Sequence, residues 1–297
     1  MKILSNKGNV SIILCLLITV LLAICAYVID IGMLYVEKAK LSNAIDSAAL
    51  AATLELPKDD TKAKAVAVDY LQKNNVDPNQ TMISIGSDHK SIQIEGAKNV
   101  RHLFAPIIGI KSNNVMARTK AIIAPVKSVK GGIRPFAVEE FDFSYGDLVT
   151  LKEGAGEGYH GNYGVVSLGG SGSTVFRSNA LYGYSGTLSV GDYINTEPGN
   201  MAGTCNDIKN YINSEYSNFD NFPRDSIRLW TIPLVDSLIL DGRDSVLVVG
   251  FATFYVENVA NKSGKLEING RFVRFVLRSP VDINLSDTGA YGAKLSK

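Results

Sequence analysis

The sequence predicts an α+β fold with a long N-terminal helix that is first membrane-spanning and then amphipathic, a small α/β domain packed on it, and a mostly β C-terminal domain. An uncharged apolar segment is followed, without a break, by helix-period patterning, and strand-like runs between glycine-rich loops fill the second half of the chain. The expected segments are a short basic leader at 1–8, a transmembrane helix at 9–30, a helical and α/β domain at 31–125, a β-rich domain at 126–283 and a polar tail at 284–297.

The apolar segment from Val10 to Ile29 carries no charge. Its length matches the roughly 20 residues that a helix needs to cross a hydrocarbon core of about 30 Å. Lys2 and Lys7 precede it and Asp30 follows it, and this charge bias favours a cytoplasmic N-terminus. We therefore expect a single-pass protein of the cell membrane, with the lipid bilayer as a partner and the remaining chain extracytoplasmic.

The alternative for this segment is a cleaved or lipidated signal sequence. Signal peptides have an apolar core of about 7 to 15 residues followed by a small-x-small cleavage site, and neither feature fits well. Ile24 precedes Cys25 where a lipoprotein site needs a small residue. With Cys15 and Cys25 inside the span, Cys205 is the one extracytoplasmic cysteine, so no intramolecular disulfide framework is expected there.

Composition supports a folded region behind the anchor. The chain is 46% hydrophobic and 20% charged, with a net charge of +1. These values are typical of a globular protein and exclude an intrinsically disordered or strongly basic chain. No nucleic-acid partner is expected.

The helix should continue beyond the membrane until Pro57 ends it, and a second helix is expected to reach about Asn74. One face of the first helix carries small side chains, which let another backbone approach closely. They are Ala44, Ala48, Ala49, Ala51 and Ala52. The favoured partner for this face is the domain's own sheet, and a neighbouring subunit is the alternative.

Three strands are expected next. TMISI and SIQIE alternate with strand period around a turn, and VMARTKAIIA adds a third candidate at Val115 to Ala124. Between the last two, VRHLFAPIIGI is apolar and contains Pro106 and Gly109. This connection is expected to be a packed loop or a short helix.

The run KGNVSIILCLL, followed by YVIDIGMLYVEKAKLSNAIDSAALAATLEL, resembles the N-terminal domain of TadG-like (TadE/TadG-like) proteins of Tad (Flp) pilus assembly. Asp30 and Gly32 match the Asp-x-Gly element that ends the family's anchor. The family's alanine-rich helix is matched by Leu41, Ala44, Asp46, Ala48, Ala49, Leu50 and Ala51. The later FAPIIGIKSNNVMARTKAII is similar to the segment that closes the family's first domain, so the resemblance covers roughly residues 7–125.

The resemblance implies a pilin-like domain and other Tad pilus or secretion-system subunits as partners. The chain departs from the pattern at Ser42, Ser47 and Ile13, the last standing where a prepilin peptidase site after Gly8 would have glutamate. A retained anchor is therefore expected. Some relatives carry a von Willebrand A domain, but DFSYG at Asp142 to Gly146 lacks the second serine of its metal site.

Two acidic residues of the helix, Asp30 and Asp46, are candidates for a role. Asp30, just beyond the span, is an interface residue or a charge partner for a neighbouring subunit's N-terminal region. Asp46 lies beside the small-residue face and would make packing specific, because an unpaired buried carboxylate is costly. Neither is expected to be catalytic.

The β-rich domain shows several strand-like runs, and the apolar run Val246 to Val256 is expected to be its central buried strand. Asn269-Gly270 predicts a tight hairpin, because both residues tolerate positive φ. GAGEGYHG and GGSGSTVF are expected to be turns or loops, since neither has the lysine of a P-loop or the strand–helix context of a dinucleotide fingerprint. No cofactor is expected.

A further stretch, GYSGTLSVGDYINTEPGNMAGTC, resembles a segment in the C-terminal part of TadG-like proteins from Gram-positive bacteria. A turn is expected within it. Its exposed polar cluster is a candidate partner surface. The cluster comprises Glu197, Pro198, Gly199 and Asn200.

An enzyme is not expected. His160, Cys205 and Arg224 or Arg228 supply the side-chain types of a sortase-like thiol transpeptidase, but Cys205 follows EPGNMAGT rather than ending an apolar strand. His89 and His102 have no companions at metal-ligand spacing and are expected in loops or at the surface.

The sequence thus predicts a membrane-anchored structural component of Tad pilus assembly, either a minor pilin-like subunit or a basal anchor. The alternative is a membrane-tethered extracytoplasmic domain that binds cell wall or surface partners through its glycine-rich loops. A sortase-like enzyme is the remote alternative.

Overall fold

The computed structural model describes residues 7–139, 144–153, 162–197, 202–238, 244–262 and 265–296. The chain divides into two compact units. The first comprises residues 1–52, 60–121 and 295–297, and the second comprises residues 53–59 and 122–294. The predicted α+β class is confirmed, with a long apolar N-terminal helix and a mostly β C-terminal region.

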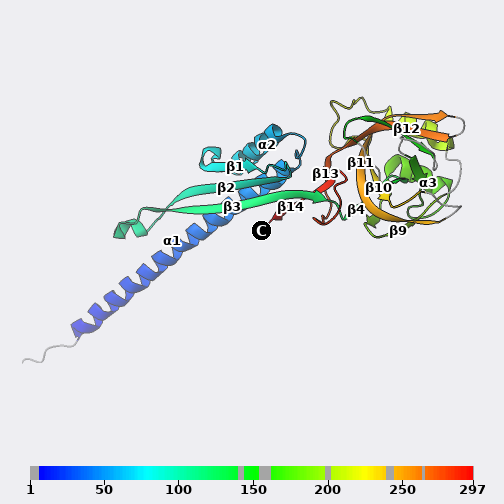
Figure 1. Ribbon diagram of the computed structural model, residues 1–297. Helices are drawn as coiled ribbons and strands as arrows, with labels where there is room; N and C mark the ends of the chain where they lie inside the picture. Colours follow the sequence, from blue (N-terminus) through cyan, green and yellow to red (C-terminus); the bar gives the residue numbers. More distant parts are fainter. Residues whose placement is uncertain are drawn as a thin grey trace, which may run out of the picture. The chain divides into compact units, whose positions relative to one another are not determined.

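The first unit is built on α1, one uninterrupted helix from Lys7 to Thr53 (Figure 1). At about 1.5 Å per residue, its 47 residues extend roughly 70 Å. The second helix, α2 (Asp60–Lys73), turns Ala63, Ala67 and Leu71 inward at helical spacing.

Three neighbouring strands of a five-stranded sheet complete this unit, in the order β1-β2-β3. They are β1 (Thr81–Ile85), β2 (Ser91–Arg101) and β3 (Ser112–Pro125). Single-turn helices η1 (Pro78–Gln80) and η2 (Ala105–Ile108) precede β1 and β3. Strands β1 and β2 pair antiparallel, with Ile83 opposite Ile94.

Helix α1 packs on β2. A Cβ added to Gly96 would stand 3.2 Å from Leu41 Cδ1 and 3.5 Å from Ile45 Cγ2, so the glycine lets the helix approach the strand closely. Alternate residues of β2, including Ile92 and Ile94, are completely buried on that face, as period-2 alternation requires. The buried half of α1 and its sheet form the core of the first unit.

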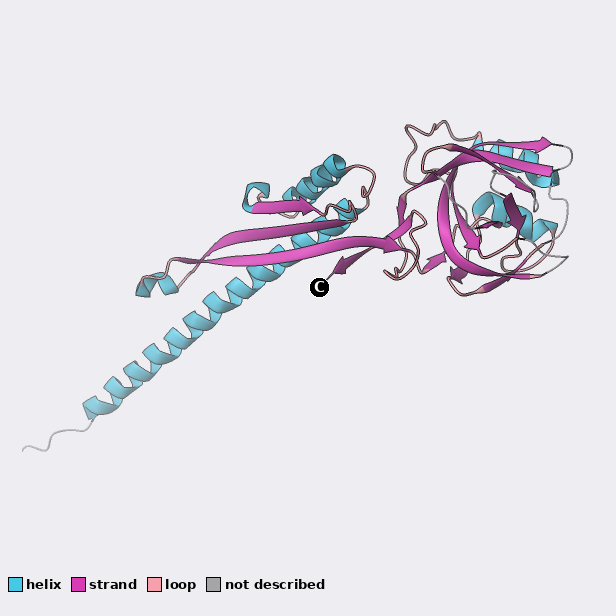
Figure 2. Cartoon of the chain, in the orientation of Figure 1, coloured by secondary structure: helices cyan, strands magenta, loops and turns pink. Residues whose placement is uncertain are grey.

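The second unit contains a seven-stranded sheet in the order β10-β5-β7-β6-β12-β11-β9. Its strands are β5 (Phe136–Glu139), β6 (Leu148–Glu153), β7 (Asn162–Val165), β9 (Tyr193–Asn195), β10 (Leu229–Val235), β11 (Ser245–Lys262) and β12 (Lys265–Val273). Strand β10 also pairs with β11, which closes six of these strands on themselves and leaves β9 outside the ring. Figure 2 shows the strongly curved strands that this closure requires.

Strand β11 includes the predicted central strand, and its residues from Phe251 to Val256 are buried. Trp230 of β10 stacks on Phe136 of β5, with ring centroids 5.2 Å apart. Phe254 and Phe272 meet edge to face from β11 and β12. These aromatic pairs form the centre of the second unit's core.

Two helices cover this core, α3 (Ser173–Tyr182) and α4 (Cys205–Ile212). Both helices differ from the loops and strands expected in this region. GGSGSTVF runs directly into α3, which buries Phe176, Ala180 and Leu181. A face of three side chains over ten residues is too short to show clear helical periodicity.

Asn269 and Gly270 do not form a hairpin turn. They lie inside β12, where Asn269 pairs with Asn258 and with Thr150 on the two neighbouring strands. A Cβ on Gly270 would stand 2.1 Å from the backbone oxygen of Tyr255, next to a register shift in β11. The glycine is therefore required by the close approach of two strands rather than by positive φ.

The rest of the second unit contains two strand pairs. Strand β4 (Ser128–Lys130) pairs antiparallel with β8 (Thr187–Ser189), and β13 (Phe275–Leu277) pairs in parallel with β14 (Ala290–Ser296). Ala290 and Tyr291 are completely buried. The segment expected to be a polar tail thus contains a strand that is partly in the core.

Candidate functional site

The apolar half of α1 stands clear of the fold. Large apolar side chains from Val10 to Ile29 expose between 48% and 68% of their surface. Among the residues that the structure describes, α1 is the one helix long and apolar enough to cross a membrane. The segment expected to span the bilayer therefore has the exposure that a lipid-facing helix needs.

Asp30 closes the exposed segment and is itself buried, with 3% of its surface accessible. Its carboxylate accepts hydrogen bonds from the backbone N–H groups of Leu103 at 2.8 Å, Phe104 at 3.1 Å and Ala105 at 2.7 Å. His102 Nδ1 lies 3.9 Å from the same carboxylate. Asp30 therefore caps the start of η2, a role that the sequence analysis did not foresee.

His102 is buried rather than at the surface, although it does lie in a loop. His89 lies in the turn after β1, is exposed, and contacts Asp60 at the start of α2, with Nδ1 2.7 Å from Oδ2. No group of three or more metal-ligating side chains occurs in the described ranges.

Strands β2 and β3 are connected by a loop, and we call its residues 103–110 the hairpin tip. It contains the short helix η2, the teal turn in Figure 1. The expectation of a short helix is thus confirmed, whereas the packed loop is not found, because the apolar side chains are exposed. The exposed fractions are 65% for Leu103, 39% for Phe104, 86% for Ile107, 76% for Ile108 and 47% for Ile110.

The small-residue face of α1 is buried. Ala48, Ala49 and Ala52 are completely buried, and Leu41 and Ala44 expose 1% and 2%. Two other candidate packing residues, Asp46 and Ala51, are half-buried. Gly32 is exposed, with open space around its Cα. The alanine face is thus buried, and Leu41 and Ile45 of the same helix lie against Gly96 of β2.

A charged clamp joins α1 to β2 beside this face. Glu37 accepts from Lys40 Nζ at 2.7 Å and from Lys98 Nζ at 2.6 Å. The hydrogen bond from Lys40 lowers the pKa of Glu37 most, and the hydrogen bond from Lys98 and the charges of both lysines lower it further. Together they outweigh partial burial, which raises this pKa. The carboxylate is therefore charged at neutral pH.

The opposite face of the first unit's sheet is open. Met82 and Met116 each expose 68% of their surface there, beside an ion pair in which Arg118 Nε lies 3.1 Å from Glu95 Oε1. These residues line a shallow groove of about 660 Å³. Flexible methionine side chains amid paired charges are typical of adaptable contact surfaces.

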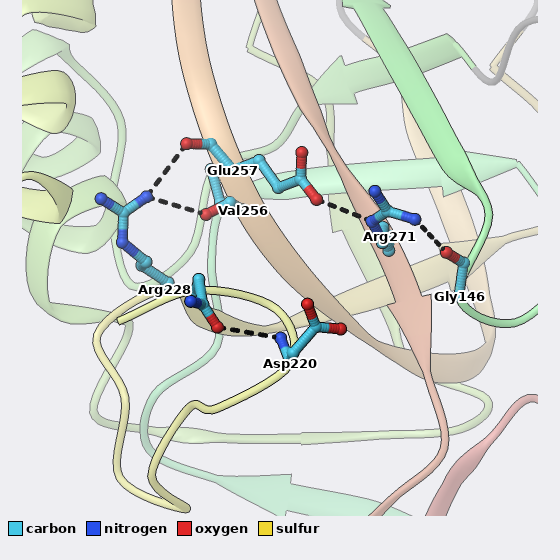
Figure 3. A network of polar contacts seen from close by, with 7 residues as sticks. Gly146, Asp220, Arg228, Val256, Glu257 and Arg271 are labelled. Carbon is cyan, nitrogen blue, oxygen red and sulfur yellow. Dashed lines mark hydrogen bonds and ion pairs between the residues drawn. The ribbon is translucent and has the colours of Figure 1, made fainter. Parts of the chain in front are cut away.

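The second unit has a polar cavity of about 480 Å³ between β11, β12 and the segment before β10. Figure 3 shows its charged residues. Arg271 Nε binds Glu257 Oε1 at 2.6 Å, Arg271 Nη1 binds the Gly146 carbonyl at 2.6 Å, and the guanidinium lies 4.8 Å from the Phe219 ring centre. These contacts hold the Arg271 guanidinium on several sides.

Arg228 forms the inner wall of the cavity and is 8% exposed. It donates to the backbone oxygens of Val256 at 3.2 Å and Glu257 at 3.0 Å, and to Asn213 Oδ1 at 3.1 Å. Arg228 therefore connects the β11 backbone to Asn213, which is a structural role. Arg224 likewise donates to the Leu54 and Val276 carbonyls.

Glu215 fastens the segment that leads to β10. Its carboxylate contacts the Ser217 and Ser226 hydroxyls and accepts from the Ile227 N–H at 2.8 Å. Burial raises the pKa of Glu215, but these hydrogen bonds together with the Arg228 charge lower it below its ordinary value. The carboxylate is a structural acceptor.

Cys205, the nucleophile of the thiol hypothesis, does not have the properties of a reactive thiol. Cys205 begins α4 with 3% of its surface exposed, and burial raises the pKa of its thiol, an effect that the Lys209 charge only partly offsets. A raised pKa disfavours the thiolate that such chemistry needs. His160 lies outside the described residues.

The candidate partner surface after β9 is described only at its first residue. Glu197 is 9% exposed, and its N–H donates to the Val165 carbonyl at 2.8 Å. This near-complete burial differs from the exposed position expected for it. Pro198, Gly199 and Asn200 lie outside the described residues.

Comparison with known proteins identifies one family. Residues 8–67 match the family model described as "Putative Flp pilus-assembly TadE/G-like". The matched region contains α1 from the exposed span to the buried alanine face, and the first half of α2. No curated protein and no solved structure matches the chain.

Proposed function

We propose that this chain, whose TadE/G-like segment at residues 8–67 indicates involvement in Tad (Flp) pilus assembly, is a single-pass structural subunit that holds a folded head at the membrane. In this role it is a basal anchor or a minor pilin-like subunit, and it is not an enzyme. Its proposed partners are the bilayer and other pilus subunits.

The observation that carries the proposal is the continuity of α1. One helix has exposed apolar side chains from Val10 to Ile29 and, about five turns beyond Asp30, a completely buried alanine face. A force applied to the folded part of the first unit is therefore transmitted to the membrane span through the hydrogen bonds of α1 and not through a flexible linker. This is the arrangement expected of an anchor under mechanical load.

The proposed orientation places the N-terminus in the cytoplasm and both units outside. The lysines before the span support it through the positive-inside rule. Ile13, in the place of a processing glutamate, supports a retained anchor. A retained anchor favours the basal role over incorporation into the filament.

The test is to delete the gene and to follow the intact protein. Loss of surface pili on deletion, with full-length protein in the membrane fraction, supports the basal anchor. A chain shortened near Gly8 and recovered with sheared filaments supports the minor pilin-like role. Unchanged piliation in the deletion strain contradicts both.

The polar cavity of the second unit favours one further candidate function, a membrane-tethered domain that binds cell-wall polymer. Arginine, carboxylate and aromatic side chains line it, and these groups suit a polar polymer. Purified protein should then be retained by isolated cell wall, and Phe219→Ala should reduce retention. Equal retention of the two proteins argues against this candidate.

A further inference from the structure

We propose that the hairpin tip, residues 103–110, is a second membrane contact that lies in the lipid interface beside the anchor, in the leaflet on the side of the first unit. The inference rests only on the anchoring part of the proposed function. It adds a monotopic contact to the single span, so that the first unit is held at two places.

The chemistry of the tip suits lipid better than water. Five large apolar side chains are exposed on one short loop, with Ile107 and Ile108 on η2 the most exposed at 86% and 76%. Transferring such side chains from water to an apolar environment is favourable, and the gain increases with the apolar area removed from water. A cluster of this kind on a soluble surface marks a contact with lipid or with another protein.

Its position points to lipid. Three successive backbone N–H groups of the tip, from Leu103 to Ala105, are bound by the carboxylate of Asp30. Asp30 follows the last residue of the apolar span directly. The tip is therefore held at the depth where α1 leaves the hydrocarbon, and any bilayer that surrounds residues 10–29 reaches it.

Backbone N–H groups of the tip also have hydrogen-bond acceptors within the protein, so they do not need water as a partner. The N–H groups at 103–105 are bound by Asp30, and Pro106 has none. Ile107 donates to Phe104, Gly109 to Pro106 and Ile110 to Ala105, all between backbone groups. Loops at lipid depth need such internal pairing, because an unsatisfied polar group in hydrocarbon costs several kcal/mol.

The flanks of the tip are cationic. Arg101 ends β2 and Lys111 follows the tip, and both side chains are exposed. Long basic side chains at this level reach lipid phosphates while their stems cover apolar surface. Basic flanks around an apolar turn are the pattern of an interfacial anchor.

The test uses the full-length protein in phospholipid vesicles whose acyl chains carry bromine, which quenches tryptophan on contact. An Ile107→Trp variant is compared with the parent protein, whose single tryptophan, Trp230, is 1% exposed in the second unit and gives a constant background. The added emission should be blue-shifted and largely quenched. Leu16→Trp in the span is the positive control.

Met82→Trp, on the open sheet face of the same unit, is the matched control and should remain unquenched. If the tryptophan of Leu16→Trp is quenched and that of Ile107→Trp is not, the span lies in the membrane but the hairpin tip does not contact lipid, and the proposal is wrong. A blue-shifted but unquenched Ile107→Trp also overturns it, because the tip is then covered by protein. If neither tryptophan is quenched, the anchoring part of the proposed function fails as well.

Discussion

The carboxylate of Asp30 accepts a hydrogen bond of 2.7 Å from the backbone N–H of Ala105, which lies 75 residues further along the chain. This bond joins the end of the apolar span to the tip of a hairpin. It gives Asp30 a structural role in this chain, because aspartate can accept from several N–H groups at once.

Asp30→Ala should loosen the hairpin tip while the span stays intact. Alanine leaves the N–H groups of residues 103–105 without their acceptor, so amide exchange at these positions should become roughly tenfold faster or more. Hydrogen exchange of the full-length protein in detergent measures this. Asp69→Ala, which removes only an exposed pair with Lys73, is the control. Equal protection in the two variants would show that the capping bonds do not order the tip.

Ala48→Leu should destabilise the first unit, because the Ala48 side chain on α1 is completely buried. Forcing a larger side chain into such a site costs about 1 to 3 kcal/mol of unfolding free energy. Ala51→Leu adds the same atoms at a half-buried position and should cost less. Global amide exchange in β2 reports the difference. Similar costs for the two variants would mean that Ala48 is not tightly packed.

The first unit could be predicted from sequence because its patterns are local and long. The span, the alanine face and the strands around Ile83 and Ile94 each repeat with one period over several turns or residue pairs. The contact between Asp30 and Ala105 could not be predicted, since it depends on where a hairpin ends in space. The apolar residues around Pro106 and Gly109 were expected to be packed, because the sequence does not show that this connection lies at the exposed end of a hairpin.

In the second unit, sequence patterns predicted β content and one buried strand but neither the closure of the sheet nor its helices. Closure depends on the pairing of β10 with β11, and the residue pattern of neither strand indicates its partner. Helix α3 carries β-branched and short polar residues, such as Thr174, Val175 and Ser178, whose intrinsic helix propensity is low. Packing of Phe176 against Phe136 stabilises it instead.

Stability of the second unit should depend on the charge of Glu215. Its pKa lies below the ordinary value of 4.5, because hydrogen bonds outweigh the effect of burial. The charged carboxylate therefore stabilises the fold above about pH 4.5, and this contribution is lost as the pH falls through the lowered pKa.

Glu215→Gln should accordingly unfold at lower denaturant concentration than the parent at neutral pH, and this difference should narrow as the pH falls below 4.5 and through the lowered pKa of Glu215. Emission of Trp230 follows the unfolding of this unit alone, since it is the single tryptophan. Glu257→Gln, which removes a different carboxylate, controls for general charge effects. A gap that stays constant with pH would rule out the linkage to Glu215.

Cys205→Ala should leave piliation unchanged, because the thiol is buried and its pKa is raised. Iodoacetamide should label Cys205 slowly in the native protein and rapidly after denaturation. Mass spectrometry of the peptide around α4 distinguishes the two rates. Rapid native labelling together with lost piliation in Cys205→Ala would support thiol chemistry instead.

Gly270→Ala tests whether Gly270 is a strand residue or a turn residue. In β12, a Cβ would stand 2.1 Å from the Tyr255 backbone oxygen and 2.6 Å from a Phe254 ring carbon, so one strand must move. The cost should be about 2 kcal/mol or more of unfolding free energy, measured with Trp230. Gly203→Ala, where a Cβ meets open space, should cost much less. A mild effect at both positions would mean that β11 and β12 do not approach so closely, and the paired position of Asn269 would then have to be reconsidered.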